Sequence, residues 1–412
     1  MSKFLEIFLG ILTAMGGFVE VGELVFSVQA GAKFGYSLLW VVLLGTIGII
    51  VYGEMAGRIA AVTKQPVMSI IRARTGFPVG IVVLVAANLV SLLTCTAEIG
   101  GMAMVLSLLV AWPHALLLVL SVLALLASVW LLSLQWIERV FGLLGLLLIA
   151  YMVTAVRLDP DWTKLLASFA PNIPQLGPGH SGITYAYFVV ALASSIMLPY
   201  ETYFYASGAI EDGWKPEDVT TNRMVAGIGF VLGSVLAVAL VIVGADFLAP
   251  KGIDPELPGA AALAPASFYG QAGLLTALLG MLFAFAGAAI ENALTVAYNL
   301  AQFFGWPWGK EQRPQQAARF TSTWIAVFVI AGLVMLTGVD PISLVEYSIV
   351  FAVVILPLTY LPVLMFARDR RVMGSHVNGR LASGLGWFYL AVVSLAALAA
   401  IPLLILSHGG AV

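Results

Sequence analysis

Three glutamates lie where two strongly apolar stretches of this sequence are interrupted by helix-breaking residues. Glu20 and Glu23 flank Gly22 in the first stretch, and Glu201 follows Pro199 in the second. Carboxylate oxygens, together with carbonyl groups that a broken helix leaves unpaired, are the ligands that hard divalent cations such as Mg²⁺ and Mn²⁺ prefer. The pattern therefore predicts a cation site at the two interruptions. The hydroxyl groups next to Glu201 extend the expected ligand set to Tyr200 and Thr202.

The composition indicates that these glutamates lie inside a membrane. Of the 412 residues, 61% are hydrophobic and only 10% are charged, and the mean hydropathy is +1.03. Soluble domains carry roughly 25% charged residues. A single cysteine, Cys95, excludes a disulfide framework, and a net charge of -2 gives no basis for nucleic-acid binding. With neither a His-Glu-x-x-His nor a Gly-x-Ser-x-Gly motif, we expect a membrane protein that is not an enzyme and needs no cofactor.

The apolar runs predict about eleven transmembrane helices in a single all-α domain spanning residues 1–412. The runs are continuously apolar rather than alternating, which excludes membrane-spanning strands. The predicted spans lie near residues 5–31, 36–61, 79–110, 114–134, 136–156, 183–210, 223–248, 271–304, 320–337, 341–366 and 384–406.

The basic residues predict the orientation in the cell membrane. With the N-terminus in the cytoplasm, 15 of the 19 Lys and Arg residues fall on the cytoplasmic side. This is the expected bias for short loops of membrane proteins. An odd number of spans then places the C-terminus outside.

The first and sixth spans are both interrupted, five spans apart. Gly16, Gly17 and Gly22 weaken the first helix, and Pro199 breaks the sixth. Three carboxylates facing lipid would cost on the order of 8–10 kcal/mol, so they must face an interior cavity or be protonated. Broken helices at matching places predict a secondary transporter with inverted repeats, near residues 5–156 and 183–366, and an additional helix at 384–406.

Three segments resemble the NRAMP (natural resistance-associated macrophage protein) family of divalent-metal transporters. The segment AGAKFGYSLLWVVLLGTIGIIVYGEMAGRIAAVTKQ is similar to the family's first-to-second helix region, and LPLTYLPVLMFARDRRVMGSHVNGRLASGLGW to its tenth-to-eleventh helix region. The segment TAEIGGMAM is similar to its acidic third helix. The resemblance implies the five-plus-five inverted-repeat fold of the LeuT type, and divalent-cation transport that is linked to protons.

The site motifs of this family are altered in the chain. The family's Asp-Pro-Gly-Asn corresponds to residues 20–23, so that its first-helix acid is Glu20 and its asparagine is Glu23. Its sixth-helix methionine corresponds to Leu198 and its tenth-helix glutamine to Ile355. The two sixth-helix histidines correspond to Tyr200 and Tyr205.

These changes replace a soft ligand with hard ones. A thioether favours softer metals, whereas Glu20, Glu23 and Glu201 form an all-oxygen site suited to Mg²⁺ or Mn²⁺. The neighbouring Met197 leaves one alternative open, because a one-residue bulge would return a thioether to the site.

Glu98 corresponds to the family's third-helix acid and is the predicted proton relay. The alternative is a protonated glutamate that forms a hydrogen bond to a neighbouring helix. For Glu291 and Asn292 in the eighth span, we favour a helix-packing role over one in the pathway.

A second function remains open on the same fold, namely transport of a small organic amine or amino acid. In that case Tyr200, Tyr203 and Tyr205 would stack against an organic cation. The expected partners are thus a divalent cation or a small organic solute, protons and the lipid bilayer. The sequence makes no prediction of oligomeric state.

Overall fold

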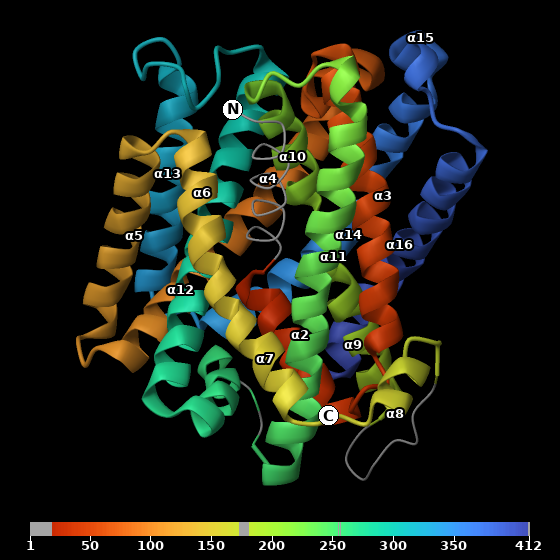
Figure 1. The fold of residues 1–412 in the computed structure, drawn as a ribbon. Coiled ribbons are helices and arrows are strands. Elements are labelled where there is room, and N and C mark those ends of the chain that lie inside the picture. Colours follow the sequence, from red (N-terminus) through yellow and green to blue (C-terminus); the bar gives the residue numbers. More distant parts are fainter. Residues whose placement is uncertain (1–18, 173–180, 254, 256, 411–412) are drawn as a thin grey trace.

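The computed structural model describes residues 19–172, 181–253, 255 and 257–410, and this part of the chain is built from helices without a strand (Figure 1). The α-helices are α2 (Val21–Phe34), α3 (Leu39–Thr63), α4 (Val67–Leu109), α5 (His114–Leu131), α6 (Leu134–Gly145), α7 (Ile149–Arg157), α8 (Trp162–Ala167), α9 (Gly182–Ile196), α10 (Pro199–Glu211), α11 (Val219–Ile242), α12 (Leu263–Phe304), α13 (Ala318–Leu336), α14 (Pro341–Arg368), α15 (Arg370–Met373) and α16 (Arg380–Leu406).

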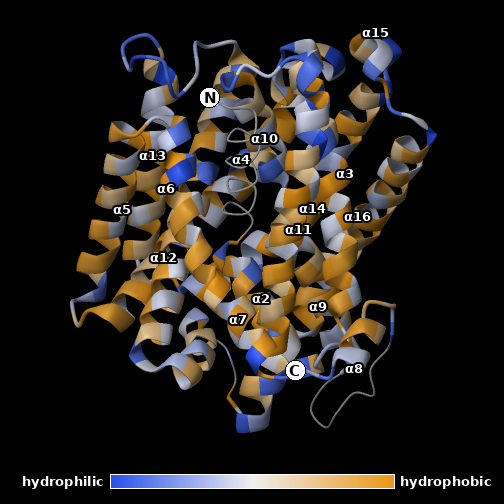
Figure 2. Cartoon of the chain, in the orientation of Figure 1, coloured by the Kyte–Doolittle hydropathy of each residue, from blue (hydrophilic) through white to orange (hydrophobic). Residues whose placement is uncertain are grey.

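Ten helical stretches among the described residues are long and apolar enough to cross a membrane. They correspond to the second to eleventh predicted spans. The α6 and α7 helices form one of them through a short 3-10 turn, and α9 and α10 form another. Most of the first predicted span, with Gly16 and Gly17, lies outside the described residues. Figure 2 shows the apolar middle of the bundle between two more hydrophilic ends.

The predicted interruption of the sixth span lies between α9 and α10. Pro199 has no amide hydrogen and holds Leu198 in an extended conformation with φ -75° and ψ 138°. Met197 also leaves the helical region, with φ -119° and ψ 55°. Proline at the first helical position then suits the start of α10. Two residues therefore separate the half-helices of this span.

Two further helices bend at glycines with positive φ. Gly76 in α4 has φ 77°, and Gly270 in α12 has φ 59°. Each glycine follows a short segment at the start of the helix and is followed by a long membrane-spanning part. The same order of elements thus occurs in both halves of the chain, and α4 and α12 pack closely against each other.

The α2 helix is fixed against the end of α11 by two glycines. A methyl group on Gly31 would lie 2.8 Å from the carbonyl carbon of Val241, and one on Gly244 would lie 2.8 Å from the amide nitrogen of Ala32. Here α11 continues as a π-helical turn over Val243–Leu248. Backbone contact of this kind is possible only without side chains at both positions.

Burial separates central helices from peripheral ones. The spans that contain α3, α11, α12 and α14 are mostly buried, whereas α5 and α16, most of whose residues are not buried, present apolar surface at the periphery. That surface faces lipid in a membrane protein, and the central helices enclose the two half-helices α2 and α10.

Candidate cation site

The helices α2 and α10 begin at the interruptions, and each carries a glutamate in its first turn. Glu20 precedes α2 with an extended backbone, and Glu23 is the third residue of that helix. Glu201 is likewise the third residue of α10. The positive end of a helix dipole stabilises an anion in the first turn by about 0.3–1 kcal/mol. Both helix starts therefore place a carboxylate at the positive end of a helix dipole.

These carboxylates are buried and have oxygens without partners. Glu20 is 2% exposed, Glu23 is fully buried, and Glu201 is 7% exposed. Neither oxygen of Glu23 has a hydrogen-bond partner, nor has Oε2 of Glu20 or of Glu201. Unpaired carboxylate oxygens at this depth are costly unless a ligand or a proton satisfies them.

No basic side chain compensates these charges within the described part of the chain. Arg58 is the only Lys or Arg classed as buried there. Its Nε donates to Glu54 Oε1 at 2.8 Å, four residues earlier in α3, and its other nitrogens donate to His376 O and Asn378 Oδ1. Arg58 therefore belongs to a network at the end of the bundle that contains α15.

The predicted site residues are electrostatically coupled to one another. Glu20 interacts by charge with Glu23, Glu98 and Glu201. The hydroxyl group of Tyr200 lies within range of the same cluster. The structure thus brings together carboxylates from α2, α4 and α10 that are far apart in the sequence.

Sequence reasoning did not assign Glu291 of α12 to the site. Its charge interacts with those of Glu20 and Glu201, so it is a further carboxylate facing the cluster. The neighbouring Asn292 donates to Ala288 O at 2.9 Å within its own helix, so this bond does not test the helix-packing role that we favoured for both residues. The sequence did contain one indication for Glu291, because an ionisable residue inside a membrane span is a functional candidate by default.

Glu98 connects α4 to the start of α2. The backbone amide of Val21 donates to Glu98 Oε1 at 2.9 Å, while Oε2 has no partner. One oxygen therefore satisfies an amide that the start of a helix leaves free. The carboxylate of Glu98 also interacts by charge with that of Glu20. A structural role for Glu98 is evident, and its predicted role as a proton relay stays a prediction.

An apolar wall occupies the positions that correspond to two ligands of the family pattern. Leu198 and Ile355 belong to one buried cluster with Val90, Ala352 and the ring of Tyr200. Leu198 is 1% exposed. Neither position offers a polar group, so the polar ligands available here come from the carboxylates and the backbone.

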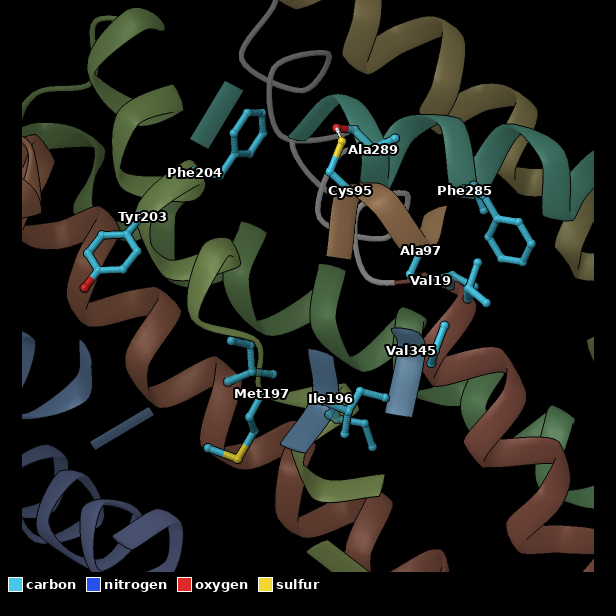
Figure 3. Packing of buried hydrophobic residues seen from close by; sticks show 14 of the residues in the cluster. Val19, Cys95, Ala97, Ile196, Met197, Tyr203, Phe204, Phe285, Ala289 and Val345 are labelled. Carbon is cyan, nitrogen blue, oxygen red and sulfur yellow. Dashed lines mark hydrogen bonds between the residues drawn. The ribbon is translucent and has the colours of Figure 1, made fainter. Parts of the chain in front are cut away.

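The thioether of Met197 points away from the carboxylates. A methyl group on Gly48 of α3 would lie 2.7 Å from its sulfur and 3.0 Å from the ring of Tyr389 in α16. Figure 3 shows this side chain directed toward α3, away from Val19 and Cys95. The sulfur is engaged in helix packing, so the bulge that would return it to the site is not formed. In the same view, Cys95 donates to Ala289 O at 3.6 Å, which is the buried packing role of a small residue.

The remaining predicted residues have packing contacts. A methyl group on Gly22 would lie 2.7 Å from Ile349 Cδ1, so this glycine lets α14 approach α2. Thr202 is fully buried beside Tyr360 of α14. Tyr205 packs edge-on against Trp214, and its hydroxyl donates to Asn222 O at 3.3 Å. These contacts occupy Tyr205, so an aromatic cage of Tyr200, Tyr203 and Tyr205 around an organic cation would lack its third ring.

The carboxylates face one another without meeting at one point. Among the described residues, no group of three or more His, Cys, Asp or Glu side chains lies close enough together to hold a metal ion alone. Such spacing suits a cation that keeps part of its hydration shell, as Mg²⁺ usually does. Backbone oxygens at the α9–α10 break, where the Tyr360 hydroxyl donates to Met197 O at 3.5 Å, are further candidate ligands.

Comparison with known proteins gives matches over nearly the whole chain. Residues 10–402 match the profile of a family described as natural resistance-associated macrophage protein-like. The divalent metal cation transporter MntH of Deinococcus radiodurans is 26% identical over 395 residues, covering 91% of this chain and 85% of that protein. MntH of Latilactobacillus sakei is 25% identical over 405 residues, covering 94% and 86%.

Solved structures confirm the predicted all-α membrane fold of the LeuT type. The manganese transporter of Eremococcus coleocola superposes with a TM-score of 0.78 at 20% identity, covering 97% of this chain and 87% of that one. The inward-facing structure of Mhp1 superposes with a TM-score of 0.57 at 15% identity, covering 98% and 89%.

Proposed function

Because the chain belongs to the natural resistance-associated macrophage protein-like family, as its sequence resemblance predicted, we propose that it transports a hard divalent cation, Mn²⁺ or Mg²⁺. It is a multi-pass membrane transporter and not an enzyme. The relatives named as divalent metal cation and manganese transporters support a divalent cargo. In this proposal Glu20, Glu23 and Glu201 are the metal ligands.

One observation carries the proposal. Glu23 and Glu201 occupy the same position in two half-helices, both are buried, and three of their four carboxylate oxygens have no partner. Buried charges in proteins are paired or coordinate metals. The described residues provide no basic partner here, so a bound cation or a proton must satisfy these oxygens, and the divalent cargo of the relatives favours the cation.

The ligand chemistry favours a hard ion over a soft one. Leu198 and Ile355 form an apolar wall, and the Met197 thioether packs against Gly48. The available donors are therefore oxygens, which suit Mg²⁺ and Mn²⁺ better than Cd²⁺. The partial exposure of Glu291 is consistent with a cavity that admits a partly hydrated ion.

Calorimetric titration of the purified protein with Mn²⁺, Mg²⁺, Cd²⁺ and an organic amine, followed by flux into liposomes, tests the proposal. We expect Mn²⁺ and Mg²⁺ to bind and be transported, and Glu20→Gln or Glu23→Gln to abolish both. The matched control is Glu217→Gln, an exposed carboxylate between α10 and α11. Tighter Cd²⁺ than Mg²⁺ binding would show that the hard-ligand argument is wrong. Binding of the amine alone would favour the organic solute.

Proton linkage through Glu98 forms part of the same proposal. Its Oε2 is unpaired and its charge interacts with that of Glu20, so a proton held there would be expelled by an arriving cation. Glu98→Gln keeps an oxygen for the Val21 amide and removes the titrating group. We expect a pH gradient to drive Mn²⁺ uptake into liposomes that contain the wild type and to have no effect with this variant. Uptake by the wild type that ignores the gradient would indicate a uniporter.

We further propose the inverted repeats and the orientation expected from the sequence. The recurring order of a half-helix, a long span and a glycine-bent helix supports repeats near 5–156 and 183–366, with α16 as the additional helix. The bias of the basic residues supports a cytoplasmic location for the end that contains α15, with the N-terminus inside and the C-terminus outside.

A further inference from the structure

Glu291 is a partly exposed position within an otherwise buried stretch of α12. Residues 284–290 and 292–299 are all buried, whereas Glu291 is intermediate. If this side chain faced lipid, the residues one turn before and after it would share its face and its exposure. They do not, so Glu291 opens into the interior of the bundle. An ionisable side chain at this depth that is reached by solvent marks a water-filled cavity.

The partly exposed carboxylate of Glu291 adjoins the central carboxylates. The charge of Glu291 interacts with those of Glu20 and Glu201, and the Tyr200 hydroxyl is within range of all three. Glu201 is 7% exposed, and its Oε2 has no partner. A cation could therefore bind the unpaired oxygen of Glu201 on one side and the partly exposed carboxylate of Glu291 on the other.

Polar side chains continue from Glu291 along α12 in one direction only. On the helical face that carries Glu291, the residues toward the Phe304 end include Thr295 and Gln302, while those toward the other end are Gly287 and Ala284. Side chains that can form hydrogen bonds to a hydrated cation are therefore found only on the side of Glu291 that leads to Phe304. The face of α12 is therefore polar between the central site and the end of the bundle that contains α15.

Two hydrogen bonds between α12 and α10 close this route. Gln302 Nε2 donates to Ser207 Oγ at 2.9 Å, and the Tyr298 hydroxyl donates to Glu211. Glu291 lies between the central carboxylates and these contacts along α12. A cation that left the central site while they were closed would rest beside Glu291.

Building on the proposed transport function, we propose that Glu291 is a second binding position for the divalent cation. The ion occupies it after leaving Glu20 and Glu201 and before release at the Phe304 end of α12. A divalent ion that left several carboxylates for a neutral region would face a high free-energy barrier. The single carboxylate of Glu291 lowers that barrier. Glu291 thus supports movement of the ion more than its equilibrium binding.

Cysteine accessibility tests the cavity. Glu291→Cys should react with a small methanethiosulfonate reagent, and saturating Mn²⁺ should slow the reaction. The matched control is Ala288→Cys, which is fully buried in the preceding turn, and the buried native Cys95 is an internal control. Both should stay unmodified. Protection of position 291 equal to that of position 288 would overturn the proposal.

Transport kinetics test the role of the carboxylate. For Glu291→Gln we expect the maximal rate of Mn²⁺ influx to fall about tenfold, with the calorimetric Kd changed by less than about twofold. Glu291→Asp should restore part of the rate. An unchanged rate, or a loss of binding as complete as in Glu20→Gln, would overturn the second position. Absence of Mn²⁺ binding and flux in the wild type would instead refute the proposed function.

Discussion

Replacing Glu201 by glutamine should change metal binding and metal-free stability in opposite directions. Glutamine keeps the shape of the side chain and one oxygen but removes its charge. Glu201 interacts by charge with Glu20, Glu23 and Glu291, and the described chain offers no buried cation that would offset the repulsion. The same charge that attracts a divalent ion therefore destabilises the metal-free protein.

The size of each effect follows from Coulomb's law. Two unit charges 4 Å apart interact by about 4 kcal/mol at an effective dielectric constant of 20, and a divalent ion doubles this gross value. Desolvation offsets most of it, because an ion that enters the site loses part of its hydration. We expect a net loss of about 1.4–2.8 kcal/mol, which is a 10- to 100-fold weaker Kd for Mn²⁺. Relief of like-charge repulsion should stabilise the metal-free protein by on the order of 1 kcal/mol.

Both quantities are measurable on one preparation. Calorimetry gives the Kd for Mn²⁺, and thermal unfolding in chelator gives the metal-free Tm. Glu217→Gln removes an exposed charge of the same kind and should leave both unchanged. A lower Tm of Glu201→Gln in chelator would refute the reasoning, because it would mean that the carboxylate has a stabilising partner. An unchanged Kd would remove Glu201 from the ligand set.

Four further substitutions have expected outcomes. Leu198→Met is close to volume-conserving and should cost less than about 1.5 kcal/mol, while raising Cd²⁺ affinity relative to Mg²⁺ in a competition titration. Gly31→Ala places a methyl group 2.8 Å from a carbonyl carbon of α11 and should lower the Tm by an amount that corresponds to about 1–3 kcal/mol. Gly208→Ala meets nothing within 4 Å and should not lower it. The pKa of Asp161 is lowered, mainly by the backbone hydrogen bond from Lys164. The ionised carboxylate therefore stabilises α8 at neutral pH, and this stabilisation is lost as the pH falls through the lowered pKa. Hydrogen exchange across α8 should follow this loss, and Asp161→Asn should remove the pH dependence.

Hydropathy and proline chemistry were sufficient to predict most of the fold. Ten predicted spans have counterparts among the described helices, and the interruption predicted at Pro199 lies between α9 and α10. These features depend on local composition, so they can be read from one stretch of sequence at a time. The bends at Gly76 and Gly270 were not predicted, because a glycine within an apolar run does not indicate whether its φ is positive.

The candidate site was predictable in its residue types but not in its spatial arrangement. Acids beside helix breaks identified Glu20, Glu23 and Glu201, since an unpaired charge in a membrane span requires a reason. The link from Glu98 to the Val21 amide depends on the packing of α4 against α2, which no local pattern contains. Glu291 required the same information, because only the burial of its neighbours distinguishes a cavity from a lipid-facing or packed position.

The matching positions of Glu23 and Glu201 suggest why the site tolerates so much charge. Each is the third residue of a half-helix that starts at a break, so each lies at the positive end of its own helix dipole. Two helix starts that converge on one cavity can hold ionised carboxylates without lysine or arginine, and a basic partner would compete with the cargo. A positive residue placed at Thr94, which is buried and has an unpartnered hydroxyl in α4 close to Glu98, would supply such a competitor. Thr94→Lys is therefore the change that should abolish Mn²⁺ flux into liposomes, because its ammonium group would occupy the place of the cargo, and flux at the wild-type rate would contradict this reasoning.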